Sequence, residues 1–168
     1  MELQLFGINH KTSNVSEREQ FIINDSNQVL LDSFLKERLG SKIDSFFGIS
    51  TCNRTEIYFY AQELMPEIVM EKTAEFLGCS KSIIQDSYKL DGTEALEHMC
   101  CVASGLDSQV LGEQEIFGQF KKAVQSFVDL KAVHGTFQKI IDEAISIAKA
   151  ARTETSIGVN PLSVSGLA

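Results

Sequence analysis

The chain has 168 residues, of which 43% are apolar and 23% are charged. This composition is ordinary for a globular protein with one sizeable core, and no apolar run approaches the ~20 residues that span a membrane, so no membrane partner is expected. The formal net charge of −8 argues against nucleic-acid binding by overall electrostatics. A nucleic-acid partner would therefore need a local basic face. Six basic residues could form one, although they are more simply interpreted as solvated positions on helices: Lys121, Lys122, Lys131, Lys139, Lys149 and Arg152.

The four cysteines lack CxxC spacing, and only three histidines accompany them. A zinc site would need distant ligands to converge, so no metal is expected. The N-terminal sequence MELQLFGINH lacks the basic and apolar regions of a secretion signal, which predicts a cytoplasmic location and reduced thiols. Adjacent Cys100 and Cys101 are therefore interpreted as small buried side chains on a helix rather than as a disulfide.

The first 40 residues predict a strand followed by a helix. Residues 3–10 have the apolar content of a strand, and the sequence SERE at 16–19 predicts a capping box that begins a helix. This helix is expected to run to about Leu39 and to end at Gly40. Its apolar face is predicted from the spacing of five side chains: Phe21, Val29, Leu30, Phe34 and Leu35.

Two strands joined by a short loop are predicted next, over residues 42–50 and 55–60. Pro66 begins a second helix that ends at Gly78, and residues 86–90 are interpreted as a fourth strand. The order β-α-β-β-α-β is that of the ferredoxin-like fold, which would account for residues 1–92 as one subdomain of an α+β protein.

The pattern becomes helical from Thr93 onward. Two apolar stripes with spacing of three and four residues predict helices that pack against a core. The first stripe comprises Phe117, Phe120, Val124, Phe127 and Val128, and the second Phe137, Ile140, Ile141, Ala144, Ile145 and Ala148. A helical subdomain is therefore expected over residues 93–156, and the small and flexible residues 157–168 are typical of the start of a linker.

The sequence STCNRT at 50–55 fills the short connection between the two predicted strands. Cys52 lies two residues from Arg54, whose guanidinium would favour the thiolate that acts as a nucleophile. Asn53 has the chemistry to donate to a developing oxyanion. An ordinary loop cysteine and an asparagine that adopts a turn conformation remain the alternatives.

Two later features permit similar pairs of interpretations. His98 lies on the predicted helix TEALEHMCCVA, either as a satisfied helical histidine or as a general acid or base beside the thiol. The segment SGLDSQVLGEQE at 104–115 is either a capped connection between helices or a second part of a site. The chain contains no GxGxxG motif and no P-loop, so it carries no nucleotide-binding fingerprint.

Four motifs in the same order resemble glutamyl-tRNA reductase over the whole chain. They are GINHKT, STCNRTEIY, HMCCVASGLDSQVLGEQEIFGQFK and the terminal ARTETSIGVNPLSVSGLA. The resemblance implies the N-terminal catalytic domain of such an enzyme, truncated before an NADPH-binding domain and a dimerisation domain. It therefore implies NADPH as the cofactor of the full-length enzyme, with no cofactor-binding residue in this fragment.

The resemblance implies that Cys52 attacks the aminoacyl ester of glutamyl-tRNA to form a thioester. NADPH then reduces the thioester to glutamate-1-semialdehyde, a precursor for tetrapyrrole (porphyrin) synthesis. His98 matches an activity-critical histidine. The implied substrate-binding residues are Thr51, Asn53, Arg54, Ser108, Glu113, Gln114, Glu115 and Gln119. Arg54 is suited to the carboxylate of the substrate side chain, because its planar fork can pair with both oxygens.

The sequence departs from the usual family pattern GEPQILGQ at two positions, where Gln114 replaces proline and Glu115 replaces glutamine. A carboxylate cannot donate the hydrogen bonds of an amide, so the contact implied for Glu115 changes. The loop also loses the rigidity that proline gives.

The implied partners are glutamyl-tRNA and, as the acceptor of the product, glutamate-1-semialdehyde aminomutase. The fragment is expected to be monomeric and the full-length enzyme a homodimer. Two functions of other classes compete with this interpretation. One is a non-enzymatic ferredoxin-like module that binds a small acidic ligand, and the other is a cysteine hydrolase that acts on an ester.

Overall fold

A computed structural model describes residues 1–107 and 114–154 of the chain. Within them, four strands form one antiparallel sheet in the order β2-β3-β1-β4. The strands are β1 (Glu2–Asn9), β2 (Ser45–Ser50), β3 (Arg54–Ala61) and β4 (Tyr88–Asp91). This order and the intervening helices confirm the predicted ferredoxin-like fold.

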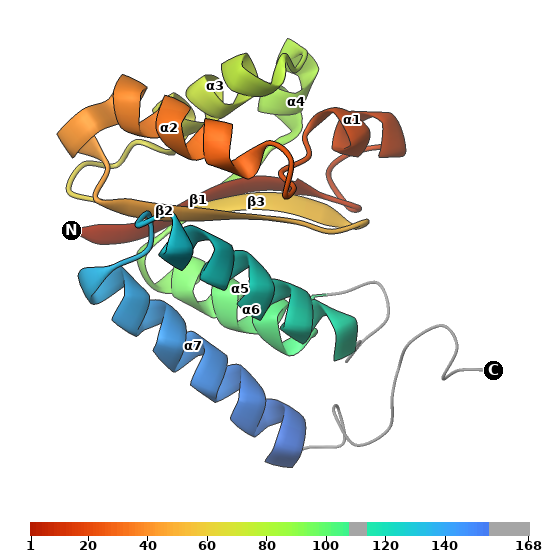
Figure 1. Ribbon diagram of the computed structural model, residues 1–168. Helices are drawn as coiled ribbons and strands as arrows, with labels where there is room; N and C mark the ends of the chain where they lie inside the picture. The colour runs from red at the N-terminus through yellow and green to blue at the C-terminus, as the bar shows by residue number, and fades with distance from the viewer. Residues whose placement is uncertain (108–113, 155–168) are drawn as a thin grey trace.

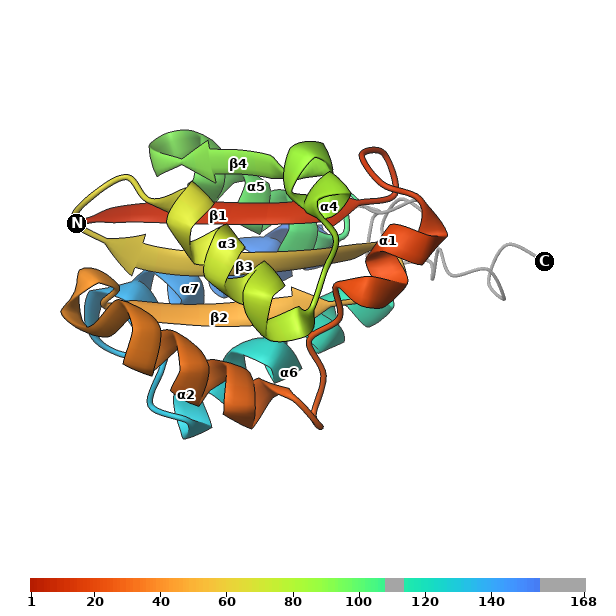
Figure 2. The same ribbon diagram turned by 90° about the horizontal axis from the view of Figure 1, so that it is seen from above.

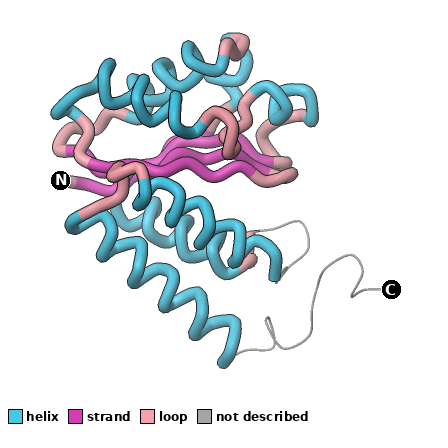
Figure 3. Tube along the Cα trace, in the orientation of Figure 1, coloured by secondary structure: helices cyan, strands magenta, loops and turns pink. Residues whose placement is uncertain are grey.

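Helices cover both faces of the sheet (Figure 1). One face carries α1 (Val15–Gln20), α2 (Gln28–Leu39), α3 (Pro66–Leu77) and α4 (Lys81–Asp86), which Figure 2 shows from above. The other face carries α5 (Gly92–Ser104), α6 (Gln114–Asp129) and α7 (Gly135–Glu154), so that the strands lie between two helical layers (Figure 3). The prediction of a boundary at residue 92 stays a prediction, and residues 157–168 lie outside the described part of the chain.

The single helix predicted over 16–39 is wrong, because the chain forms two helices there. The cap is Asn14 rather than Ser16: its Oδ1 accepts from the Glu17 N–H at 2.8 Å, and Glu17 Oε1 accepts from the Asn14 N–H at 3.0 Å. Between the helices, Asn24 Oδ1 accepts from the N–H groups of Ser26 and Asn27 at 2.9 and 3.2 Å. Asparagine side chains that bind nearby N–H groups compete with helical hydrogen bonds, which explains the break.

The break also changes the buried face of α2. Val29 and Leu30, two of the residues predicted to face the core, are 52% and 64% exposed. Leu35 is buried as predicted, and Leu31 and Leu39 are buried with it and face the sheet layer. The helix ends at Gly40 as predicted, with φ of 53°, and a short 3-10 turn (Gly40–Lys42) delays the start of β2 to Ser45.

The prediction for α3 is confirmed at both ends. Pro66 occupies the first turn, and Gly78 caps the helix in the left-handed conformation with φ of 68°. The strand predicted over 55–60 extends by one residue at each end, and the strand predicted over 86–90 begins at Tyr88. The short helix α4 has no counterpart among the predicted elements.

The two predicted apolar stripes form the core beneath the sheet. Phe120 of α6 and Phe137 of α7 are fully buried against Phe47 of β2, with ring centroids 5.5 and 6.0 Å from it. Phe47 also stacks on Tyr58 of β3 at 4.9 Å. Glycines with positive φ lie where the helices are separated: Gly105, with φ of 87°, follows α5, and Gly135, with φ of 57°, begins α7. The interpretation of both stripes as helix-packing surfaces is therefore confirmed.

The cysteines and the basic residues are placed mostly as predicted. Cys100 and Cys101 are free thiols on α5, although both are half-buried rather than buried. The five lysines named as candidates for a basic face are exposed, four of them on helices and Lys131 in the connection between α6 and α7. Arg152 does not belong with them, because it is only 8% exposed and donates to the Ser104 carbonyl at 2.8 Å. No helix in the described ranges is long and apolar enough to cross a membrane.

Candidate active site

Cys52 lies exposed in the three-residue connection between β2 and β3. The connection is closed by the Thr51 N–H, which donates to the Arg54 carbonyl at 2.8 Å, while the Asn53 N–H donates to Thr51 Oγ1 at 3.2 Å. These bonds hold the loop at the end of the sheet without covering the thiol. The thiol is thus presented to solvent by a fixed turn.

The loop and α6 enclose a small cavity of about 30 Å³. Its lining brings together six residues that the sequence implied as a site, namely Thr51, Cys52, Asn53, Arg54, Glu115 and Gln119, along with Ile116. Ser108 and Glu113 lie outside the described residues, and only the backbone of Gln114, which begins α6, is described. The roles of these three residues stay predictions.

Arg54 is the charged centre beneath the loop, with only 2% of its surface exposed. One end of its guanidinium lies 3.3 Å from Glu56 Oε2. The other end lies 2.9 Å from Asp107 Oδ2 and also donates to the Asp107 carbonyl, which ties β3 to the turn after α5. Two carboxylates therefore offset the charge of Arg54, which the spacing along the sequence does not reveal.

Glu56 is fully buried and accepts hydrogen bonds from three elements. Tyr58 Oη donates to Oε1 at 2.8 Å, and Tyr88 Oη of β4 and His98 Nε2 of α5 both contact Oε2. Together with Arg54, these three groups form what we call the Glu56 cluster. His98 is therefore a partner of Glu56, and it is not among the residues that line the cavity at Cys52.

Gly7 of β1 makes the Glu56 cluster possible. It lies between Glu56 and Tyr88 in the sheet, paired with one on each side. A Cβ atom at Gly7 would lie 2.7 Å from Glu56 Cγ and 2.7 Å from the Thr55 carbonyl oxygen, too close for either. The absence of a side chain lets the glutamate cross β1 and reach the tyrosine two strands away.

Burial and neighbouring charges shift the pKa values of Glu56 and of both tyrosines in this cluster. Burial alone would raise the pKa of Glu56, but the hydrogen bond and charge of His98, with the Arg54 charge, lower it to about 2. Burial and the neighbouring Glu56 charge raise the pKa of both Tyr58 and Tyr88, so their hydroxyls remain donors. Burial and the Arg54 charge lower the pKa of His10, which lies nearby. The cluster is built around one carboxylate that stays ionised.

This ionisation predicts a loss of stability in acid. The pKa of Glu56 in the folded chain, about 2, lies below its ordinary value of 4.5, so the folded state binds fewer protons than the unfolded state between those values. The contribution to the free energy of unfolding is complete above pH 4.5 and is lost as the pH falls toward 2. It is on the order of 3 kcal/mol. Urea unfolding measured from pH 6 to 2.5 should show this decline, and Glu56→Gln should flatten it. A parent and a variant with the same pH dependence would contradict the prediction.

The other thiols have environments unlike that of Cys52. Burial raises the pKa of Cys79 to about 11 and raises the pKa of Cys100 and Cys101. Cys79 Sγ also donates to the Gln20 carbonyl at 3.3 Å. A high pKa leaves little thiolate near neutral pH, which makes these three sulfurs poor nucleophiles.

Glu56, Tyr58, Tyr88 and Asp107 were not among the predicted site residues. The signal for the first two was present in TEIYFY, because a glutamate in a strand whose neighbours are all buried must find partners inside the protein. No comparable signal exists for Tyr88 or Asp107, whose roles depend on how distant segments meet. In the described ranges, no group of three or more His, Cys, Asp or Glu side chains could hold a metal ion.

A sequence model of a protein family, described as Glutamyl-tRNAGlu reductase, N-terminal domain, matches residues 6–155. The chain belongs to this family. Glutamyl-tRNA reductases of Alcanivorax borkumensis and Pseudoalteromonas atlantica are 36% and 38% identical to it, over 98% of this chain and 39% and 38% of their own length. The solved Glutamyl-tRNA Reductase from Methanopyrus kandleri has a TM-score of 0.74 at 29% identity, over 96% of this chain and 37% of that one.

The chain therefore spans about two fifths of the length of these glutamyl-tRNA reductases. Within the N-terminal domain of the family, the described residues place Cys52 in the loop at the end of the sheet, next to α6. The Glu56 cluster lies directly beneath that loop. The chain thus presents an exposed thiol above a buried ionic cluster.

Proposed function

We propose that this chain carries the acyl-transfer half of a glutamyl-tRNA reductase, with Cys52 as the nucleophile. The observation that carries the proposal is the exposed thiol of Cys52 in a hydrogen-bonded loop, where three other cysteines are half-buried with raised pKa values. Membership of the family and the printed names of the relatives supply the substrate, glutamyl-tRNA.

The proposed step is a transfer of the glutamyl group from oxygen to sulfur. The thiolate of Cys52 attacks the ester carbonyl, the carbon–sulfur bond forms, and the bond to the ribose oxygen breaks. That oxygen takes up a proton and the tRNA leaves as the free alcohol, so a thioester remains on the protein. The Asn53 side-chain amide is proposed to donate to the carbonyl oxygen as its charge develops, because the Asn53 backbone N–H is already bonded to Thr51 Oγ1.

Arg54 and Glu115 are proposed to bind the two charged ends of the glutamyl group. The side of Arg54 that faces Glu56 is fully buried, so a substrate carboxylate approaches from the side of Asp107, which is 24% exposed. The substrate carboxylate then takes the place of the Asp107 carboxylate on the guanidinium fork. Glu115 accepts from the α-ammonium group, a contact that suits a carboxylate better than an amide.

The reduction of the thioester is proposed to take place on the longer protein, with NADPH as the source of hydride. The cavity at Cys52, about 30 Å³, is far below the ~300 Å³ at which small-molecule sites begin, so these residues do not fit a dinucleotide. The wider proposal includes a cytoplasmic homodimer as the full-length enzyme, a monomeric fragment, and an aminomutase as acceptor of the product.

The test of this function is a glutamyl adduct on Cys52 without any NADPH. Incubating the chain with glutamyl-tRNA, quenching in acid and measuring the intact mass should reveal an adduct that hydroxylamine removes. Cys52→Ser should abolish the adduct, because a hydroxyl is a much weaker nucleophile than a thiolate. Cys79→Ser is the matched control and should retain it. An adduct that persists in Cys52→Ser would remove this residue from the role.

The same experiment separates the competing functions. A binding module with an inert cysteine forms no adduct, whereas a cysteine hydrolase forms the adduct and releases glutamate in many turnovers. Simple thiol alkylation does not separate these functions. Cys52 is exposed and the other three thiols are half-buried, so Cys52 should react first whether or not it is catalytic.

A further inference from the structure

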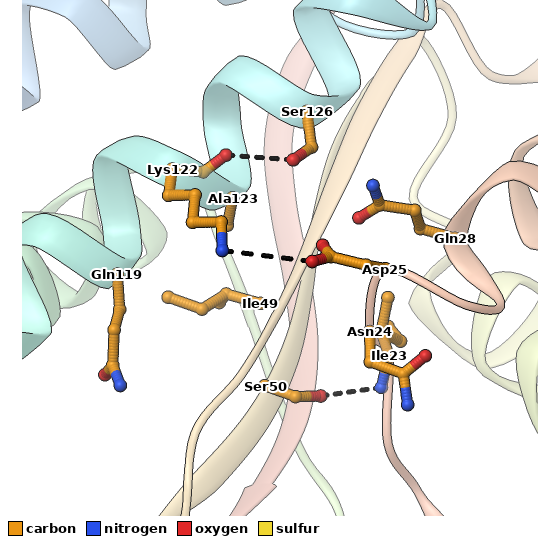
Figure 4. A pocket seen from close by; sticks show the side chains of 11 residues that line it. Ile23, Asn24, Asp25, Gln28, Ile49, Ser50, Gln119, Lys122, Ala123 and Ser126 are labelled. Atoms are coloured by element: carbon orange, nitrogen blue, oxygen red, sulfur yellow. Dashed lines mark hydrogen bonds and ion pairs between the residues drawn. The ribbon is translucent and has the colours of Figure 1, made fainter.

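A second and larger cavity, of about 260 Å³, lies beside the loop that holds Cys52 (Figure 4). It opens at the free edge of β2, between the connection that joins α1 to α2 and one face of α6. Asn24, Asp25 and Gln28 line it from the first side, and Lys122 and Ser126 line it from the second. Its volume is close to the ~300 Å³ at which small-molecule sites begin.

This cavity adjoins the smaller cavity at Cys52 along α6. Gln119 lines both cavities, and Ser50 of the larger one is followed directly by Thr51 of the smaller one. Glu115, Gln119 and Lys122 are spaced by four and three residues, which places them on one face of the helix. The two cavities therefore share one helical wall, with Gln119 at their junction.

The size of the smaller cavity decides what the larger one holds. A space of about 30 Å³ takes only a few atoms at the reacting carbon, so the alcohol part of an ester on Cys52 must extend into neighbouring space. In any aminoacyl-tRNA, that alcohol is the 3′-terminal adenosine. We propose that the cavity at the β2 edge binds this terminal adenosine, an assignment that rests on the proposed function.

The lining has the chemistry that a nucleotide requires. Lys122 and Asp25 are paired only loosely at the rim, with Nζ and Oδ2 3.8 Å apart and side chains 75% and 77% exposed. The ammonium group is thus available for a phosphate and the carboxylate for the ribose hydroxyls. Although the chain has a net charge of −8, Lys122 would give the phosphate a positive charge at the point where it enters the cavity.

The edge of β2 offers hydrogen bonds to the base. The Phe46 N–H points away from β3, since it donates to the Ala132 carbonyl at 3.0 Å. Backbone groups alternate in direction along a strand, so the N–H and C=O of Gly48 also face this edge. Gly48 lines the cavity, and adenine presents an amino donor beside a ring-nitrogen acceptor, the complement of that pair. Ser50 is less available, because its Oγ accepts from the Ile23 N–H at 2.8 Å and bonds to Thr55 Oγ1 at 2.8 Å.

The binding test uses adenosine monophosphate as the probe and the isotope-labelled chain of 168 residues. Titration should shift the backbone amide resonances of residues 23–28, 48–50 and 119–126 and should leave those of β4 unchanged. Asp25→Ala should weaken binding about three- to tenfold, because one hydrogen bond to a ribose hydroxyl is worth about 1 kcal/mol. Shifts elsewhere, or none at millimolar concentration, would overturn the proposal.

A second measurement ties the cavity to acyl transfer. Ser126→Phe fills the cavity from α6, and Ser146→Phe places the same ring on the exposed face of α7 as the matched control. Each variant is acylated from glutamyl-tRNA and from a small glutamyl thioester that lacks a nucleoside. The rate with glutamyl-tRNA divided by the rate with the thioester should fall about tenfold or more in Ser126→Phe. The ring would block binding of the nucleoside, a part of the substrate remote from the reacting carbon, and only glutamyl-tRNA carries that part. The ratio should stay at the parent value in Ser146→Phe.

The two substrates distinguish the failure of this inference from the failure of the proposed function. If the parent is acylated by neither substrate, the proposed function fails, and the adenosine monophosphate titration still decides the cavity. If the parent is acylated by both and Ser126→Phe leaves the ratio unchanged, the assignment of the terminal adenosine to this cavity is wrong.

Discussion

Glu56→Ala is expected to lower the free energy of unfolding by about 3–5 kcal/mol, the usual cost of removing one partner from a buried ion pair. The carboxylate is fully buried and accepts from Arg54, Tyr58, Tyr88 and His98. Its loss leaves a buried guanidinium and two buried hydroxyls without their common acceptor. Urea unfolding at pH 7, followed by circular dichroism, measures the change.

The matched control is Glu75→Ala, which removes a surface carboxylate paired with Arg38 and Lys72. Its side chain is 49% exposed, and exposed pairs contribute little, so the urea midpoint should stay near that of the parent. The urea midpoint of Glu56→Gln should lie between those of Glu56→Ala and Glu75→Ala. The amide keeps the shape of the carboxylate but brings N–H donors against the tyrosine hydroxyls. Equal midpoints for Glu56→Ala and Glu75→Ala would contradict the idea that the cluster stabilises the fold.

Arg54→Lys is expected to slow the glutamylation of Cys52 by about 10–100-fold, the size of effect that follows from losing bidentate recognition of a carboxylate. Lysine keeps the charge, but it cannot contact Glu56 and Asp107 at once in the planar geometry that Arg54 uses. Single-turnover acylation by glutamyl-tRNA gives the rate, and the same substitution in a full-length enzyme should lower kcat/KM by a similar factor.

Arg38→Lys provides the control for Arg54→Lys, because Arg38 is 44% exposed on α2 and lies over the ring of Phe34. It should leave the acylation rate unchanged. A decrease in the Arg54→Lys rate that disappears after correction for the folded fraction would indicate a structural role alone. A rate within about twofold of the parent would exclude Arg54 as the group that binds the substrate carboxylate.

The order of strands and helices was predictable because local signals agreed with the global fold. Pro66 and Gly78 mark the ends of α3, and the apolar residues of β3 suit a strand that is covered by helices on both faces. The break between α1 and α2 was missed because the apolar spacing continues across it, whereas the break depends on the side chain of Asn24. A hydrophobic pattern does not report hydrogen bonds of that kind.

The site was predictable only in part. Thr51, Cys52, Asn53 and Arg54 are neighbours in sequence, and the family resemblance joined Glu115 and Gln119 to them. All six line the same small cavity, and their roles stay predictions. The Glu56 cluster draws its members from β3, β4 and α5, which are far apart in the chain. Its assembly depends on a single missing side chain, that of Gly7, and spacing along the sequence carries no trace of such an arrangement.

The hydrogen bond from Phe46 to Ala132 bears on solubility as well as on the cavity. β2 is an edge strand with the sequence SFFGIS, and an apolar edge with free backbone groups is a template for pairing with another copy. The connection between α6 and α7 blocks the first half of that edge, helped by His134 Nε2, which contacts the Asp44 carbonyl oxygen at 3.0 Å. Loosening this connection would uncover Phe46 and convert a folded chain into a nucleus for aggregation.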